Sequence, residues 1–178
     1  MGSTILNNRI SEQEYLQNPA YERYEYFGAE AHAINVGNKR HARAQIRMGA
    51  ALIGYFQSNN SGDAFTEFRC RLRVGDESRF YLPDVAVVIG GRIVGEDFLD
   101  GAPDLAIEIR SPDDTLASLI RKAQDYLAAG SRTVWLVLPE EQSILVMDGK
   151  EVRTYSKSEV LKDENLLPGF ELAIESIF

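Results

Sequence analysis

The sequence predicts an α/β fold, with a mixed central sheet flanked by helices. Apolar residues spaced three to four apart indicate amphipathic helices before residue 60 and again after residue 111. Short apolar or alternating runs, bounded by glycine, proline and aspartate, indicate strands between and after these helices. Hairpin spacings dominate the middle of the chain, so the sheet should contain antiparallel neighbours.

The composition is typical of a soluble globular protein. The 178 residues are 44% hydrophobic and 26% charged, which excludes a disordered chain, a fibrous repeat and a small disulfide scaffold. At about 150 residues per domain, we expect a single domain over residues 1–178, with a short N-terminal helical lead-in. No apolar run is long enough to span a membrane, the N-terminus does not resemble a signal peptide, and Cys70 is the one cysteine. We therefore expect a cytoplasmic protein without a membrane partner.

Three elements are expected in the first third of the chain. A short helix should follow Ser11, which can form a capping box with Glu14. The aromatic-rich segment 21–34 predicts a strand or hairpin, and Asn38 can cap a longer helix that reaches about residue 57. The apolar positions expected on the core side of that helix are Ala42, Ile46, Ala50, Ile53 and Phe56. A polar turn is expected over residues 58–63.

The remainder of the chain predicts strands and one more helix. In segment 70–74, apolar residues alternate with arginines, which is the period of a half-buried strand. Further strands are predicted over 80–89, 105–109 and 133–138, and a hairpin over 143–147 and 152–155. The helix should start within residues 111–114 and end at Gly130.

Two carboxylates interrupt apolar strands. Asp84 lies in the apolar run 81–88, and Glu108 is the one charged residue of the run 105–109. A lone charge in such a strand is costly to bury, so each needs a partner. For each acid considered alone, the favoured explanation is that it pairs with an arginine or caps a backbone group. Together, on neighbouring strands, they favour an oxygen-ligated divalent cation, and we expect both to face one pocket.

A lysine and an arginine lie within reach of these acids. Lys122 falls at the edge of the apolar stripe of the second long helix, one turn before Tyr126. Its stem can run along apolar surface and bring the ammonium near the sheet; a solvated lysine is the alternative. Arg110 shares a strand face with Glu108 and can neutralise it or take the place of a lysine. If Lys122 acts in the site, it must be partly buried and paired with at least one acid.

Two basic clusters leave their role open. One cluster, on a helix, consists of Lys39, Arg40, Arg43 and Arg47; the other, on a strand, consists of Arg69, Arg71 and Arg73. Contacts with phosphates and exposure to solvent explain each cluster equally well. The net charge of −8 argues against general binding of polyanions. The aromatics Tyr21, Tyr24, Tyr26 and Phe27 could stack on bases, but core packing is favoured for them, as it is for Trp135.

Several short motifs, in this order and spacing, resemble the Uma2 family, whose members are described as restriction endonucleases of the PD-(D/E)XK nuclease superfamily. These motifs are Pro83-Asp84, the run PDLAIEIRSP at 103–112, Lys122 and Tyr126 four apart, and VWLV at 134–137. The segment 24–30 is similar to the family's Y-E-x-x-D-G-E, with Gly28-Ala29 where Asp-Gly is usual. His41 and the run LPGF at 167–170 also fit the family pattern.

The resemblance implies roles for individual residues. Asp84 would be the aspartate of the PD motif, and Glu108 the acid of the (D/E)XK motif. The strict motif places lysine at position 110, where this chain has Arg110. In the family the lysine function is thought to have moved to the following helix, which points to Lys122. Glu25 is a candidate third carboxylate.

The resemblance further implies a restriction endonuclease-like fold and a metal-dependent endonuclease acting on nucleic acid, for which we expect DNA. Asp84 and Glu108 would hold Mg²⁺ or Mn²⁺. Cutting both strands of a duplex with one site per chain calls for a homodimer. Two alternatives stay open: a catalytically inactive module that keeps the fold to bind nucleic acid or protein, and a structural protein with internally paired carboxylates.

Overall fold

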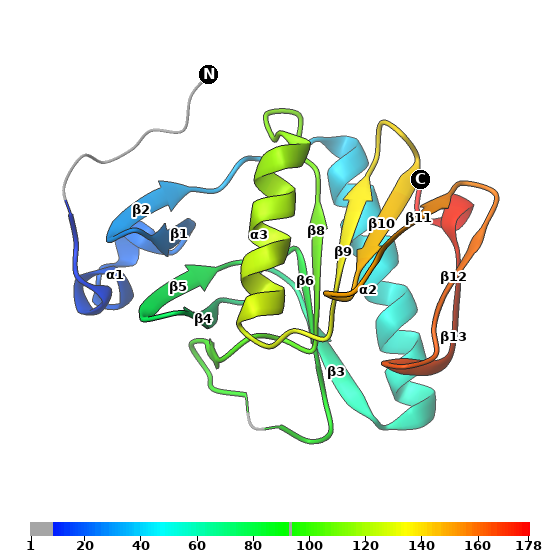
Figure 1. Cartoon of the computed structure of the whole chain (residues 1–178), viewed down its shortest axis with the longest axis horizontal. Coiled ribbons are helices and arrows are strands. Elements are labelled where there is room, and N and C mark those ends of the chain that lie inside the picture. The colour runs from blue at the N-terminus through cyan, green and yellow to red at the C-terminus, as the bar shows by residue number, and fades with distance from the viewer. Residues whose placement is uncertain (1–8, 93) are drawn as a thin grey trace.

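A six-stranded mixed sheet with a helix on each face forms the centre of the protein (Figure 1). The computed structural model describes residues 9–92 and 94–178. The strands are β3 (Gly62–Phe65), β6 (Val85–Ile89), β8 (Leu105–Ile109), β9 (Thr133–Leu138), β10 (Ser143–Met147) and β11 (Val152–Ser156). They lie in the order β11-β10-β9-β8-β6-β3. β8 and β9 are parallel, and the other neighbours are antiparallel. The predicted α/β fold with a mixed sheet is confirmed.

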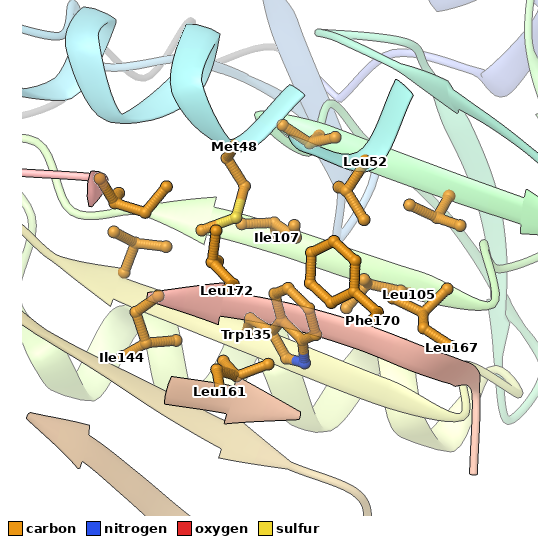
Figure 2. Close-up of a cluster of buried hydrophobic side chains, with 14 of the residues drawn as sticks. Met48, Leu52, Leu105, Ile107, Trp135, Ile144, Leu161, Leu167, Phe170 and Leu172 are labelled. Atoms are coloured by element: carbon orange, nitrogen blue, oxygen red, sulfur yellow. The ribbon is translucent and has the colours of Figure 1, made fainter. Parts of the chain in front are cut away.

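The two long helices cover opposite faces of this sheet. Helix α2 (Lys39–Asn59) packs with Val85 and Val87 of β6, whereas helix α3 (Leu116–Ala128) packs with Ala86 and Val88 of the same strand. The alternation follows from the two-residue period of a strand. Figure 2 shows the α2 side, where Met48 and Leu52 meet apolar residues of β8 and β9. Trp135 is fully buried there, as predicted.

A five-stranded sheet lies beside the central one (Figure 1). Its strands are β1 (Tyr24–Phe27), β2 (Glu30–Ala33), β4 (Cys70–Val74), β5 (Glu77–Tyr81) and β7 (Leu99–Asp100), in the order β2-β1-β5-β4-β7. β1 and β2 form the predicted hairpin. The aromatics of this region pack into a buried cluster with Tyr15 and Phe80, so core packing is confirmed for Tyr21 and Tyr26.

The remaining elements cap the structure at its two ends. Helix α1 (Glu12–Gln17) begins after Ser11, whose hydroxyl accepts from the Glu14 amide over 3.1 Å. The short 3-10 helix η1 (Pro19–Tyr21) follows it. Near the C-terminus, β12 (Val160–Asp163) and β13 (Leu167–Ala173) pair with each other, and η2 (Ile174–Ser176) follows. Within the described residues, no helix is long and apolar enough to cross a membrane.

The face that α2 buries differs from the predicted one. Of the predicted core positions, Phe56 is buried, whereas Ala42, Ile46 (71% exposed), Ala50 and Ile53 (44% exposed) are not. The helix buries Ala44, Met48 and Leu52 together with Phe56. Small apolar residues surround most of this helix, so its periodicity is ambiguous. Packing against the sheet settles the orientation, because Met48, Leu52 and Phe56 join one apolar cluster with residues of β6, β8 and β9, and burial stabilises roughly in proportion to apolar area.

Three boundaries also differ from the sequence prediction. The predicted strand 80–89 is divided into β5 and β6, which belong to different sheets, because Pro83 lacks the amide that a continuing ladder needs. β3 occupies the end of a segment predicted to be a polar turn. Helix α3 begins after Thr115, which caps it, and Gly130 lies just past its end at φ 111°.

Candidate active site

The two predicted carboxylates lie beside each other at one end of the central sheet. Asp84 directly precedes β6, and Glu108 is in β8. These strands are antiparallel neighbours in which Val85 opposes Ile107, so the next pair in register is Asp84 with Glu108. Both line one cleft of about 630 Å³. The expectation that they share a pocket is therefore confirmed.

Both carboxylate oxygens of Asp84 have partners that fix the side chain. Its Oδ2 accepts from the Ile109 amide over 2.6 Å, which ties the start of β6 to the end of β8. Its Oδ1 lies 3.1 Å from His41 Nε2. Gln45 of α2 donates to the Asp84 carbonyl over 3.1 Å. Asp84 is thus fixed from the sheet on one side and from α2 on the other.

His41 is built into the first turn of α2. Asn38 Oδ1 accepts from the His41 amide over 3.1 Å. A Cβ on Gly37 would lie 2.5 Å from the His41 ring, so glycine is needed for the chain to pass so closely. Burial alone would lower the pKa of His41, but the hydrogen bond and the charge of Asp84 outweigh it and raise that pKa.

Glu108 is almost fully buried, at 4% exposure. The hydroxyl of Tyr126 donates to its Oε1 over 2.8 Å, and the Lys122 ammonium donates to its Oε2 over 2.8 Å. Burial raises the pKa of Glu108 to about 8 against the opposing effect of the Lys122 charge. Because Lys122 and Tyr126 are four residues apart, one face of α3 supplies both donors.

Lys122 lies between two carboxylates from different sheets. Its Nζ pairs with Glu108 and with Glu25 of β1, and it is 5.3 Å from the centre of the Tyr81 ring. Burial would lower the pKa of Lys122, but the two carboxylates raise it above its ordinary range. The ammonium therefore stays charged. The predicted burial and acid pairing of Lys122 are confirmed.

The alternative candidate, Arg110, is directed elsewhere. Its guanidinium donates to Glu141 over 2.8 Å, and Arg110 is not among the described residues that line the cleft. The geometry thus favours Lys122 as the cation of this site.

Glu67 also lines the cleft. Its backbone has a left-handed conformation at φ 49°, and its carboxylate lies 3.8 Å from the Arg23 guanidinium.

Comparison with known proteins identifies the family. A family model described as "Uma2: Putative restriction endonuclease" matches residues 12–175. The chain belongs to the Uma2 family. Among solved structures it is similar to the crystal structure of a "putative nuclease belonging to DUF820" from Anabaena variabilis ATCC 29413. The identity is 24% over 93% of this chain and 96% of that chain, with a TM-score of 0.82, which shows a shared fold. No curated protein matches the sequence.

One wall of the Uma2 cleft carries a network that the sequence patterns did not reveal. The Tyr81 hydroxyl donates to Asp125 Oδ2 over 2.6 Å, and Arg79 donates to the same oxygen over 2.5 Å. Burial and the Asp125 carboxylate raise the pKa of Tyr81. The network forms across β5 and α3, which are far apart in sequence, so no local pattern predicts it; the spacing of Arg79 and Tyr81 shows only that they share a strand face.

Most arginines of the two basic clusters are engaged within the Uma2 protein. Arg40 pairs with Glu140, and Arg71 pairs with Asp100 and Glu12. Arg43 and Arg47 donate to the carbonyl of Phe178, and Arg69 donates to that of Tyr21. Two other arginines, Arg23 and Arg121, line the cleft and are exposed.

The donor set fits a hard divalent cation. Asp84 and Glu108 offer carboxylate oxygens from adjacent strands, and Mg²⁺ in proteins is commonly bound through one or two carboxylates, with water as the other ligands. Across residues 9–92 and 94–178, no group of three or more histidine, cysteine, aspartate and glutamate side chains is arranged to hold a metal. Asp84 and Glu108 are therefore the residues that would hold such an ion, and the buried Glu108 would gain from the added positive charge.

Proposed function

We propose that this Uma2 protein is a metal-dependent endonuclease that hydrolyses phosphodiester bonds in nucleic acid, with DNA as its substrate. The observation that carries the proposal is the convergence of Asp84, Glu108 and Lys122 in one cleft. A family described as restriction endonucleases supports the same reaction. One nuclease-like domain over residues 1–178 would carry this activity.

Each of these side chains has a part in phosphodiester hydrolysis. Mg²⁺ or Mn²⁺ held by Asp84 and Glu108 would supply charge neutralisation at the phosphate and lower the pKa of a bound water. The Lys122 ammonium, held charged by its acid partners, can orient the attacking water or stabilise the charge that develops on the phosphate. Tyr126 keeps Glu108 aligned through its hydroxyl. Glu25 completes the group through its pairing with Lys122.

The exposed arginines of the cleft suggest how nucleic acid approaches. Arg121 precedes Lys122 in α3, and Arg23 directly precedes β1, which carries Glu25, so both line the cleft close in sequence to residues of the candidate site. Arginine contacts with phosphate position a nucleic acid without reading its sequence. We assign Arg121 and Arg23 to the phosphates that flank the scissile bond.

A homodimer is part of the proposal. A chain with one centre of this kind cuts one strand at a time, so cutting both strands of a duplex at one place calls for two chains. Two-fold dimers are the commonest oligomers of soluble proteins. Light scattering should then give twice the mass of the 19.9 kDa chain, and a monomer at high concentration would contradict this part.

The test is cleavage of supercoiled plasmid and of labelled oligonucleotides, single-stranded and duplex, with Mg²⁺ or Mn²⁺. We expect cleavage that EDTA abolishes. Loss of activity in Asp84→Asn would tie the cleavage to this site and exclude a contaminating nuclease. If no cleavage products appear with any metal ion, any nucleic acid and any protein concentration, the endonuclease proposal is wrong.

One observation favours a second candidate, an inactive module that retains the nuclease fold. Every carboxylate oxygen of Asp84 and Glu108 already has a partner among the described residues. Internally paired acids of this kind need no metal. Calorimetric titration with Mg²⁺ or Mn²⁺ separates the candidates: the endonuclease should bind the ion, and Asp84→Asn should weaken that binding.

A further inference from the structure

Glu25 joins three segments of the chain at the edge of the candidate site. Its Oε1 accepts from the Leu82 amide over 3.1 Å and also pairs with the Lys122 ammonium. Its side chain is only 13% exposed. Leu82 belongs to the connection that leads to Asp84, and Lys122 belongs to α3. One oxygen of a residue in β1 therefore touches both the acid-bearing segment and the lysine.

The Lys122 ammonium has two carboxylate partners with different surroundings. Glu108 belongs to the acid pair, and its second oxygen is taken by Tyr126. Glu25 belongs to the five-stranded sheet, and the same Oε1 that meets Lys122 is fixed by a backbone amide. A cation bound by both Asp84 and Glu108 would compete with Lys122 for the Glu108 carboxylate and weaken the Glu108–Lys122 ion pair. Glu25 would then be the carboxylate that remains to hold the lysine.

The charges of the cluster agree with this division. A Glu108 carboxylate that ligates a divalent cation would be ionised. Asp84, Glu108 and Glu25 would then carry three negative charges, which the cation and the Lys122 ammonium balance, the His41 imidazole aside. Without Glu25 the same ion would leave an excess positive charge beside Lys122. Like charges at close range in a low-dielectric site repel strongly.

We propose that Glu25 is a positioning residue that retains the Lys122 ammonium in the cleft when Glu108 is engaged by a cation, and that it is not itself a metal ligand. The proposal deepens the proposed function, since it assigns the third carboxylate of the site to the lysine. Glu25 acts on the reaction by holding Lys122, and not by touching the reacting atoms.

Acylation of the Lys122 amine, followed by mass spectrometry, tests this without metal or substrate. Glu108→Gln removes the Glu108 charge, as an engaged cation would, so Lys122 should stay as protected as in the unmodified protein. The double variant Glu25→Gln/Glu108→Gln should label about tenfold faster, because a charge-assisted hydrogen bond is lost. Equal labelling of the single and double variants would overturn the proposal.

Glu25→Gln alone gives an independent measurement if Glu108→Gln fails to fold. Glutamine keeps an acceptor for the Leu82 amide and removes the charge, so a purely structural role predicts little change. We expect faster labelling of Lys122 in Mg²⁺ and a lower kcat with KM unchanged. Glu171→Gln, which removes the partner of an exposed lysine, Lys162, outside the residues that line the cleft, is the matched control and should behave as the unmodified protein.

Two further outcomes are decisive. If Glu25→Gln abolishes Mn²⁺ binding in calorimetry while Lys122 stays protected, Glu25 is a ligand and the proposal is wrong. If the unmodified protein neither binds metal nor cleaves nucleic acid, the endonuclease function fails. The metal-free labelling of the double variant still decides whether Glu25 holds Lys122.

Discussion

The Asp84 carboxylate accepts a hydrogen bond from the Ile109 amide over 2.6 Å, which joins the starting end of β6 to the final residue of β8. The hydrogen bond gives Asp84 a structural role in addition to its proposed metal-binding role. It places the carboxylate beside Glu108, its neighbour in the adjacent strand. The two motif strands are therefore fixed to each other before any metal or substrate arrives.

Substitutions of Asp84 should separate its structural role from its proposed metal-binding role. Asp84→Ala leaves the Ile109 amide without its acceptor, so the free energy of unfolding should fall by about 1–3 kcal/mol. Asp84→Asn keeps an acceptor and should lose less. Urea denaturation of the metal-free proteins measures both. An alanine variant as stable as the unmodified protein would show that relief of a buried charge outweighs the lost hydrogen bond.

Tyr126→Phe removes the hydroxyl that donates to Glu108 Oε1. A buried carboxylate oxygen then lacks a partner, and the variant should lose about 1–3 kcal/mol of stability. Tyr155→Phe is the matched control, since the Tyr155 hydroxyl makes only a long contact of 3.4 Å with the Lys162 carbonyl. Thermal or urea unfolding of the two variants should rank Tyr126→Phe as the less stable. The reverse ranking would contradict the assigned role.

Arg121→Gln should weaken nucleic-acid binding without changing the fold. Each arginine–phosphate contact with duplex DNA contributes about 0.9 to the slope of log K against log salt, so the slope should fall by about that amount. Fluorescence anisotropy in Ca²⁺, with labelled duplexes of several sequences, measures this, and the loss should be uniform across sequences. Arg153→Gln, far along the chain beside Tyr155, is the control. An unchanged slope in Arg121→Gln would remove this arginine from the binding surface.

Alkaline pH should destabilise the protein through two buried acids. Burial raises the pKa of the Cys70 thiol from 9.0 to about 12, and that of the Tyr15 hydroxyl from 10.0 to about 12. The folded state favours their protonated forms. Their contribution is therefore complete below the pKa values of the unfolded chain and is lost as the pH rises from about 9 toward 12. Urea midpoints measured from pH 8 upward should decline, and Cys70→Ala or Tyr15→Phe should each flatten the decline. Identical slopes in all three proteins would contradict the burial argument.

Local signals predicted a large part of the fold. The hairpin of β10 and β11 was predicted because Asp148-Gly149 is a turn signal between two apolar runs. The buried face of α2 was predicted correctly at Phe56 and wrongly at the other four positions, because small apolar residues surround the helix and only contacts with the sheet select a face. β3 was missed, since an edge strand of four residues carries a weak pattern and depends on pairing with β6.

The candidate site was predictable where it rests on anomalies within single strands. Asp84 and Glu108 are conspicuous because each is a charge in an apolar run. The pairing of Lys122 with Glu25 joins segments almost a hundred residues apart, and local pattern contains no trace of it. The direction of Arg110 was likewise undetermined, because at the end of β8 the chain turns and the side chain meets Glu141.

The most direct test of the account compares Lys122→Met with Arg110→Met in metal-dependent plasmid cleavage. Lys122 contacts Glu108 and Glu25 inside the cleft, whereas Arg110 pairs with Glu141 away from the residues that line it. With both variants shown to be folded by circular dichroism, Lys122→Met should abolish cleavage in Mg²⁺ and Mn²⁺, and Arg110→Met should keep it near the level of the unmodified protein. Full activity in Lys122→Met together with its loss in Arg110→Met would contradict the assignment of the catalytic centre.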